Sequence, residues 1–229
     1  MKAVVLYCFL LVCTHVCAQK TKHAQEAQGE ILPISINITH ELKIFNTDTA
    51  ITYSISLCAD VPNNKKPYKV AHNQETGHVF LILQQINFSD TINKVFGFYP
   101  RKSLPTLFSR RTKSVIKDNS GREYDVSISK LLSEDEFKKA LHLSKEYAKR
   151  SYHLNKFNCY DYAVLIYNAV AGNTVRFTTA KYPFIFGRGG SPVCIYRELK
   201  KTSESSSAPS SEIQFGSLVA PISTGRVLK

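Results

Sequence analysis

The sequence has no long apolar run after its first eighteen residues, so we expect no later segment to cross a membrane. No two cysteines have the spacing of zinc ligands, and His72 with His78 alone does not make a metal site. The chain also has no internal repeat and no basic stripe interleaved with aromatic side chains, the pattern that binds nucleic acid. We therefore expect no metal, no transmembrane segment in the mature chain and no nucleic-acid partner.

Acidic residues are few compared with basic ones. The chain has 30 Lys and Arg residues against 18 Asp and Glu residues, which gives a formal net charge of +12 at pH 7. A basic surface favours anionic partners such as cell-wall polymers or phospholipid headgroups. The basic residues are scattered along the chain, so an ordinary solvated surface explains them equally well.

Residues 1–18 have the pattern of a secretory signal peptide. Lys2 supplies the positive start, and the apolar run that follows is too short to be a permanent membrane anchor. Val16 and Ala18 occupy the −3 and −1 positions of a small-residue cleavage site. We therefore expect a secreted protein, periplasmic or extracellular, whose mature chain starts with a loose polar leader at residues 19–30.

Only three cysteines lie outside the signal peptide, namely Cys58, Cys159 and Cys194. In an oxidising compartment an odd number leaves at least one thiol unpaired, unless the chain is cross-linked to another. Cys58 could pair with Cys194, or Cys194 could pack as a free side chain on its helix. The sequence leaves both alternatives open, because spacing does not give the distance between the two sulfurs.

Residues 31–200 have the pattern of one α+β domain. Alternating apolar residues predict strands near 34–38 and 51–57. Residues 78–86 are rich in branched and aromatic side chains, and residues 94–99 have the same character after a short polar turn. These two segments predict a β-hairpin.

Two clear helices follow, and both carry start signals. Residues 133–150 begin with a capping box and have one apolar face. Asn158 is the expected cap of the second helix, with Asp161 at its third position. A shorter helix is expected at 192–200. Residues 201–229 are expected to be a polar, Ser-rich tail, because the Ser-rich segment has no means to bury a core, although Phe215, Leu218 and Val219 could dock as a short strand.

Cys159 is the candidate nucleophile. It lies in the first turn of the second helix, where unpaired backbone N–H groups and the helix dipole favour a thiolate. A cysteine nucleophile needs a base within hydrogen-bond reach. His78 begins the most convincing buried strand, and it is the candidate base.

Three short motifs accompany these two residues. They are Gly77-His78-Val79-Phe80, Gly97-Phe98-Tyr99-Pro100 and Asn158-Cys159-Tyr160-Asp161-Tyr162-Ala163. In this order the chain resembles circularly permuted papain-like cysteine hydrolases, which are relatives of NlpC-type peptidoglycan amidases and lecithin:retinol acyltransferases. It looks closest to bacterial secreted or toxin-associated domains, and the resemblance spans about residues 78–200.

The resemblance implies a papain-like fold, in which an antiparallel sheet packs against the helix that bears the cysteine. It implies Cys159 as nucleophile, His78 as base, and a third polar group that orients the histidine. No residue matches that third group clearly. If the hairpin turns near Ser89 and Asp90, Tyr99 lies opposite His78 and is the candidate orienter. The oxyanion would be met by the backbone N–H of Cys159.

We therefore expect a secreted thiol hydrolase, of the amidase, peptidase or acyl-transfer type, that needs no cofactor. Its substrate would be a peptide or an acyl compound, and export with a basic surface suits peptidoglycan. The resemblance to toxin-associated domains implies an inhibitor or immunity protein as a partner. The alternative is a catalytically inactive secreted binding module on the same scaffold. Burial of Cys159 away from any imidazole would favour that alternative.

Overall fold

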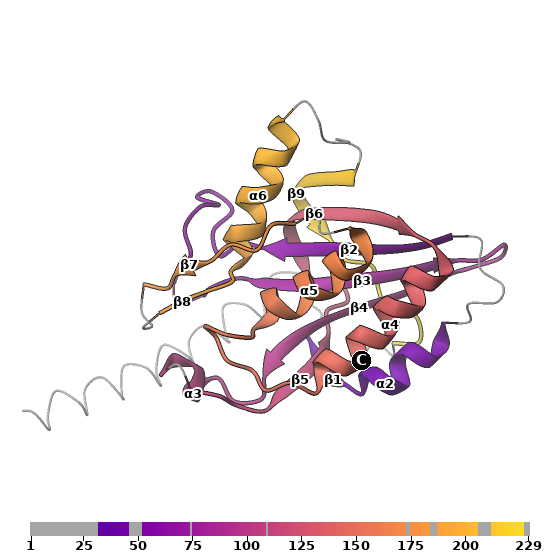
Figure 1. Ribbon diagram of the computed structural model, residues 1–229, viewed down its shortest axis with the longest axis horizontal. Helices are drawn as coiled ribbons and strands as arrows, with labels where there is room; N and C mark the ends of the chain where they lie inside the picture. The colour runs from indigo at the N-terminus through magenta and orange to yellow at the C-terminus, as the bar shows by residue number, and fades with distance from the viewer. Residues whose placement is uncertain are drawn as a thin grey trace, which may run out of the picture. The chain divides into compact units, whose positions relative to one another are not determined.

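A seven-stranded sheet forms the centre of the computed structural model, in the order β1-β5-β4-β3-β2-β6-β9 (Figure 1). Every neighbouring pair of strands is antiparallel. The structure describes residues 32–45, 52–73, 75–108, 110–172, 175–183, 187–205 and 212–226. The predicted signal peptide and the leader at 19–30 lie outside these ranges. A large antiparallel sheet with several helices is compatible with the predicted α+β class.

The strands of the sheet are β1 (Ile34–Ile36), β2 (Thr52–Asp60), β3 (His78–Ile86), β4 (Thr91–Pro100), β5 (Ser114–Asp118), β6 (Glu123–Leu132) and β9 (Ile213–Val219). A separate two-stranded sheet consists of β7 (Ala180–Lys181) and β8 (Arg188–Gly189). The helices are α2 (Ile38–Glu41), the 3-10 turn η1 (Leu42–Ile44), α3 (Leu104–Leu107), α4 (Glu134–Ala148), α5 (Cys159–Ala171) and α6 (Pro192–Glu204). No helix within the described ranges is long and apolar enough to span a bilayer.

The predicted hairpin is confirmed as β3 and β4. Its ladder runs from Ile86 opposite Thr91 to Phe80 opposite Gly97. The same register, continued by two residues, places His78 opposite Tyr99, and their rings stack with centroids 4.1 Å apart. The turn therefore determines which residues face each other at the far end of the hairpin.

The two faces of the sheet carry different cores, because successive side chains of a strand point to opposite faces. The front face packs against α4 and α5 (Figure 1), and the rings of Phe98 and Tyr162 stack there with centroids 5.1 Å apart. The back face has a smaller apolar cluster that includes Phe80 and Val95, and Ala220 from beyond β9 packs on it. Each strand is thus buried on both faces near the middle of the sheet.

The helix signals in the sequence are borne out at α4 and α5. Ser133 and Glu136 form the expected capping box, and Gly172 ends α5 in the left-handed conformation with φ of 75°. α6 extends to Glu204, beyond the expected end at residue 200. Ser191 occupies its N-cap position but makes no side-chain cap hydrogen bond.

The expectation of a polar tail from residue 201 to 229 is wrong for its second half. Strand β9 pairs with β6 along the edge of the sheet, with Ile213 opposite Ile128 and Val219 opposite Glu123. Ile213 is buried in the main core, and Ser223 is buried further along. The reason is that β6 offers an open edge, and the few apolar residues after the Ser-rich stretch are spaced to cover it.

The cysteine question left open by the sequence has a clear answer. Cys58, Cys159 and Cys194 are all free and all buried. Cys58 belongs to the back-face cluster, whereas Cys194 lies in the main core with α6. The chain therefore forms no disulfide between Cys58 and Cys194.

Candidate functional site

The start of α5 is fixed by the two residues that the sequence assigns to its cap. The Asn158 side-chain oxygen accepts from the N–H groups of Tyr160 at 2.8 Å and Asp161 at 3.4 Å. In return, the Asp161 carboxylate accepts from the Asn158 N–H at 2.9 Å. This reciprocal pair satisfies donors that the first turn of a helix leaves without partners.

Asn158 also joins α5 to its surroundings. Its side-chain NH₂ donates to the carbonyl oxygens of Leu154 at 2.7 Å and Gly190 at 2.9 Å, and the residue is only 1% exposed. The hydroxyl of Tyr182 donates to the same Gly190 oxygen at 2.5 Å. Cys159 is therefore held at a helix start that is tied to the chain on both sides.

The Cys159 sulfur lies against strand β3. The backbone N–H groups of Val79 and Tyr160 lie close enough to the sulfur to lower its pKa. The Val79 contact is just beyond the end of the β3–β4 ladder, whose last pair is Phe80 with Gly97. The sulfur therefore lies beside the peptide bond that links His78 to Val79.

The His78 ring approaches this point from the other face of the sheet. His78 is 5% exposed and lies on the back face, in line with Phe80 and stacked on Tyr99. Within the described residues, no hydrogen bond joins the ring to the Cys159 sulfur, and the Nε2 atom of His78 has no hydrogen-bond partner. The predicted nucleophile and base thus lie near the same end of β3 but on opposite faces of the sheet, with no hydrogen bond between them.

The electrostatics keep both groups neutral. The pKa of Cys159 is raised to about 11, mainly by burial and also by Asp161, whereas the N–H groups of Val79 and Tyr160 and the charge of Arg122 oppose the shift. Burial, followed by Arg122 and Lys117, lowers the pKa of His78 well below its usual value. The direction for Cys159 is opposite to that expected from its place at a helix N-terminus. Removal of the thiolate from water outweighs the N–H groups that favour it.

Gly97 makes room for a residue that the sequence analysis missed. A Cβ on Gly97 would lie 2.3 Å from His78 Nε2 and 2.8 Å from the side-chain oxygen of Asn119. The histidine ring and the Asn119 amide therefore converge over the one residue of β4 that has no side chain. The Asn119 oxygen also has no hydrogen-bond partner among the described residues.

Asn119 is oriented by Tyr99. The Asn119 NH₂ donates to the Tyr99 hydroxyl, and this contact turns the amide oxygen away from Tyr99. Tyr99 itself lies against the face of the His78 ring, not at a ring nitrogen. Tyr99 therefore contacts His78 as expected, while the Asn119 oxygen and Nε2 of His78 both lie beside Gly97. The sequence around Asn119, DNSG, signals only a turn.

Arg122 adds a positive charge near His78, Tyr99 and Cys159. Its guanidinium pairs with the Asp60 carboxylate, and its charge acts on the pKa values of Cys159, His78 and Tyr99. A pocket of about 250 Å³ lies beside it, and one of the residues that line the pocket, Gly77, directly precedes His78 in the sequence. The residues that line the pocket are Asp60, Val61, Pro62, Glu75, Thr76, Gly77 and Arg122.

The described part of the chain offers no group of three or more His, Cys, Asp or Glu side chains that could hold a metal ion. The groups gathered around the end of β3 are a thiol, an imidazole, an amide and a guanidinium. Comparison of the chain with protein-family models, with curated proteins and with solved structures finds no match.

Proposed function

We propose that the protein is a secreted thiol hydrolase of the circularly permuted papain-like type, in which Cys159, His78 and Asn119 act together. The observation that carries the proposal is the junction at Val79. The N–H of Val79 acts on the sulfur and lowers its pKa, and the residue directly before Val79 is His78. Catalytic hydrogen bonds are often loose without substrate and tighten when it binds.

Asn119 is the third polar group in this proposal. Its side-chain oxygen can only accept, so Nε2 of His78 would carry the hydrogen that points to it. The other ring nitrogen, Nδ1, is then unprotonated and free to accept the thiol proton. Tyr99 keeps the Asn119 amide in the required orientation through its hydroxyl.

The reaction starts from a neutral thiol and a neutral imidazole. In this proposal substrate binding must bring the two groups together from opposite faces at the end of β3; Nδ1 of His78 then takes the proton of Cys159 as the sulfur attacks the carbonyl carbon of an amide or ester. The oxyanion accepts the backbone N–H of Cys159, and the Asn119 oxygen stabilises the imidazolium. The proton then passes to the leaving amine or alcohol, and water hydrolyses the acyl-enzyme. Export and the net charge of +12 support a cell-wall peptide as substrate.

A secreted binding module without catalysis is the second candidate. The observation that favours it is the burial of Cys159, which is 9% exposed and makes no hydrogen bond to the His78 ring within the described residues. Such a module would use the pocket beside Arg122 and leave the thiol unreacted.

The two candidates are separated by hydrolysis assays on the mature protein, with peptidoglycan fragments and a p-nitrophenyl ester as probes. We expect Cys159→Ala to abolish hydrolysis and His78→Ala to lower it by about 10²- to 10⁴-fold, the usual contribution of a general base. Cys194→Ala is the matched control, since it removes another buried thiol. Hydrolysis that persists in Cys159→Ala would contradict Cys159 as the nucleophile, whereas absence of hydrolysis from the wild type while fragment binding remains would support the binding module.

A further inference from the structure

The seven residues after β9 form a segment that returns across the back face. We call residues 220–226 the C-terminal strap. Its first hydrogen bonds are to the turn after β5: Ala220 donates to the Arg122 carbonyl at 2.9 Å and accepts from Gly121 at 3.1 Å. Further on, Thr224 donates to the Asn93 carbonyl at 2.8 Å. The strap thus runs from that turn to β4.

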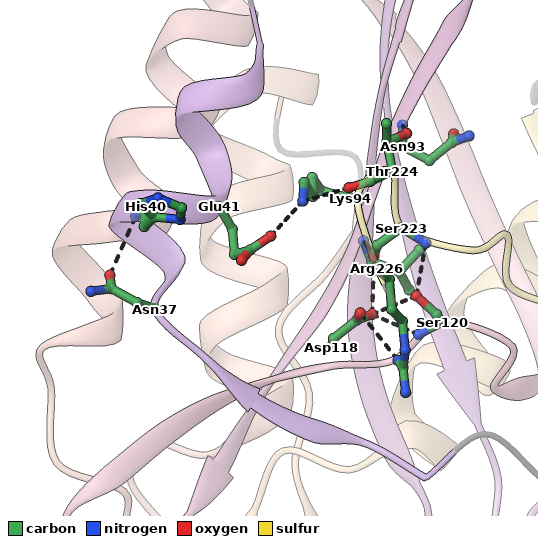
Figure 2. A network of polar contacts seen from close by, with 11 residues as sticks. Asn37, His40, Glu41, Asn93, Lys94, Asp118, Ser120, Ser223, Thr224 and Arg226 are labelled. Atoms are coloured by element: carbon green, nitrogen blue, oxygen red, sulfur yellow. Dashed lines mark hydrogen bonds and ion pairs between the residues drawn. The ribbon is translucent and has the colours of Figure 1, made fainter. Parts of the chain in front are cut away.

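The strap covers an edge that β5 leaves open. Strand β5 pairs only with the second half of β4, from Phe96 to Pro100. Along the first half of β4, the strap replaces β5 as the hydrogen-bonding partner. The Asn93 N–H donates to the Thr224 hydroxyl at 2.9 Å, and the Val95 N–H donates to the Ser223 hydroxyl at 3.0 Å. Lys94, which pairs with Glu41 of α2, also donates to the Thr224 carbonyl at 2.8 Å (Figure 2).

The strap also binds a buried carboxylate at the end of β5. Arg226 pairs with Asp118 at 3.1 Å, and the two side chains are only 5% and 6% exposed. The Ser223 hydroxyl donates to the other carboxylate oxygen at 3.0 Å. Figure 2 shows Asp118 enclosed by Ser120, Ser223 and Arg226. Loss of one partner from such a buried pair leaves an uncompensated charge, so the contacts strongly favour one position of Asp118.

The residue after Asp118 is Asn119, and both of its neighbours are held by this network. Ser120 donates its N–H and its hydroxyl to Asp118 at 2.8 and 2.6 Å, and it accepts the Ser223 N–H at 2.8 Å. The Asn119 N–H donates to the Val95 carbonyl at 2.9 Å. Val95 is the same residue whose N–H binds Ser223. Asn119 is therefore linked to the strap through three residues, Asp118, Ser120 and Val95.

We propose that Ser223 and Arg226 are positioning residues for Asn119 and act through Asp118 and the turn at 118–122. The inference rests on the proposed function, because Asn119 matters for chemistry only if it orients His78. The last residues of the chain then complete a site whose nucleophile lies on α5. Neither Ser223 nor Arg226 contacts the reacting atoms.

The experiment is a double-mutant cycle that combines Arg226→Gln with Asn119→Ala in the full-length mature protein. In the wild-type background we expect Arg226→Gln to lower kcat for the ester probe by about tenfold to a hundredfold with KM nearly unchanged, as misplaced groups do. In the Asn119→Ala background the same substitution should have almost no further effect, because the residue it positions is gone. Arg226→Lys, which keeps the charge, should restore most of the activity.

A second readout does not depend on hydrolysis. NMR titration of His78 should show that Arg226→Gln lowers the pKa of the imidazole in the wild-type background but not in Asn119→Ala. Ser223→Ala, a milder change, should give a smaller shift of the same sign. Equal effects of Arg226→Gln in both backgrounds, in either readout, would overturn the proposal. A coupled pKa shift in a protein without hydrolysis would instead uphold the positioning role and reject the enzyme.

Discussion

The front and back faces of the sheet build the candidate site in different ways. On the front, Cys159 is placed by a helix whose start is determined by residues within a few positions of it, Asn158 and Asp161. On the back, Asn119 is placed by contacts with Val95 and the C-terminal strap, which lie far away in the sequence. The position of the proposed nucleophile is therefore a local feature of the chain, whereas the orientation of the proposed base depends on contacts between distant segments.

The largest expected effect comes from removal of the back-face support. Deletion of residues 213–229 removes β9 and the strap, and it leaves Asp118 buried without Arg226. We expect the free energy of unfolding to fall by about 3–5 kcal/mol, the usual loss when a buried pair is broken. Urea denaturation followed by circular dichroism measures it. Lys138→Ala, which breaks an exposed pair on α4, is the control. An unchanged urea midpoint in the deletion would mean that the back face does not depend on its C-terminal contacts.

The next effect tests the point where the histidine and the amide converge. Gly97→Ala places a methyl group 2.3 Å from His78 Nε2, so the ring or the amide must move. We expect a loss of stability of about 1–3 kcal/mol, typical of overpacking, together with loss of hydrolysis. Thermal unfolding and the ester assay measure the two effects. A variant with normal stability and activity would show that Gly97 is not needed for this approach.

A smaller effect is expected from the front-face cap. Asn158→Ala removes the acceptor for the first turn of α5, and we expect a loss of about 2 kcal/mol, the upper end for a helix cap. The upper end applies because the same side chain also donates to Leu154 and Gly190. Ser133→Ala at the exposed start of α4 is the matched control, with an expected loss of about 1 kcal/mol. Equal losses in the two variants would mean that the burial of Asn158 adds nothing.

The smallest expected effect is a decrease in the free energy of unfolding as the pH is lowered. Because the pKa of His78 lies below its usual value in the folded protein, the unfolded chain binds a proton that the folded chain does not. Stability from this group is present above pH about 6.5 and falls by up to about 1.4 kcal/mol per pH unit below it. His78→Gln should flatten this dependence in denaturation curves between pH 7.5 and 5.5. Burial also lowers the pKa of a second histidine, His153. The variant His153→Gln therefore measures how much this residue contributes to the pH dependence of stability. An unchanged slope in His78→Gln would contradict the assignment.

The contrast between the faces also explains what the sequence could predict. The hairpin, α4 and α5 follow from periodicity and caps, which are properties of neighbouring residues. Strands β5 and β9 are short and pair with distant segments, so their apolar residues carry little local signal. Asn119 follows β5, and its approach to His78 depends on the register of β3, β4 and β5 together. The turn sequence around Asn119 therefore does not predict that this residue lies near His78, because the pairing of three strands brings the two together.

The strap has a consequence for the order of events during folding. Ser223 and Asp118 are separated by 105 residues, Ser223 and Val95 by 128, and Thr224 and Asn93 by 131. Closing loops of this length carries an entropic penalty that short-range contacts such as the α5 cap avoid, so the strap should dock after the hairpin and the helices have formed. A chain that has not yet docked its last residues would therefore hold Cys159 on a formed helix, while the histidine still lacks its fixed partner.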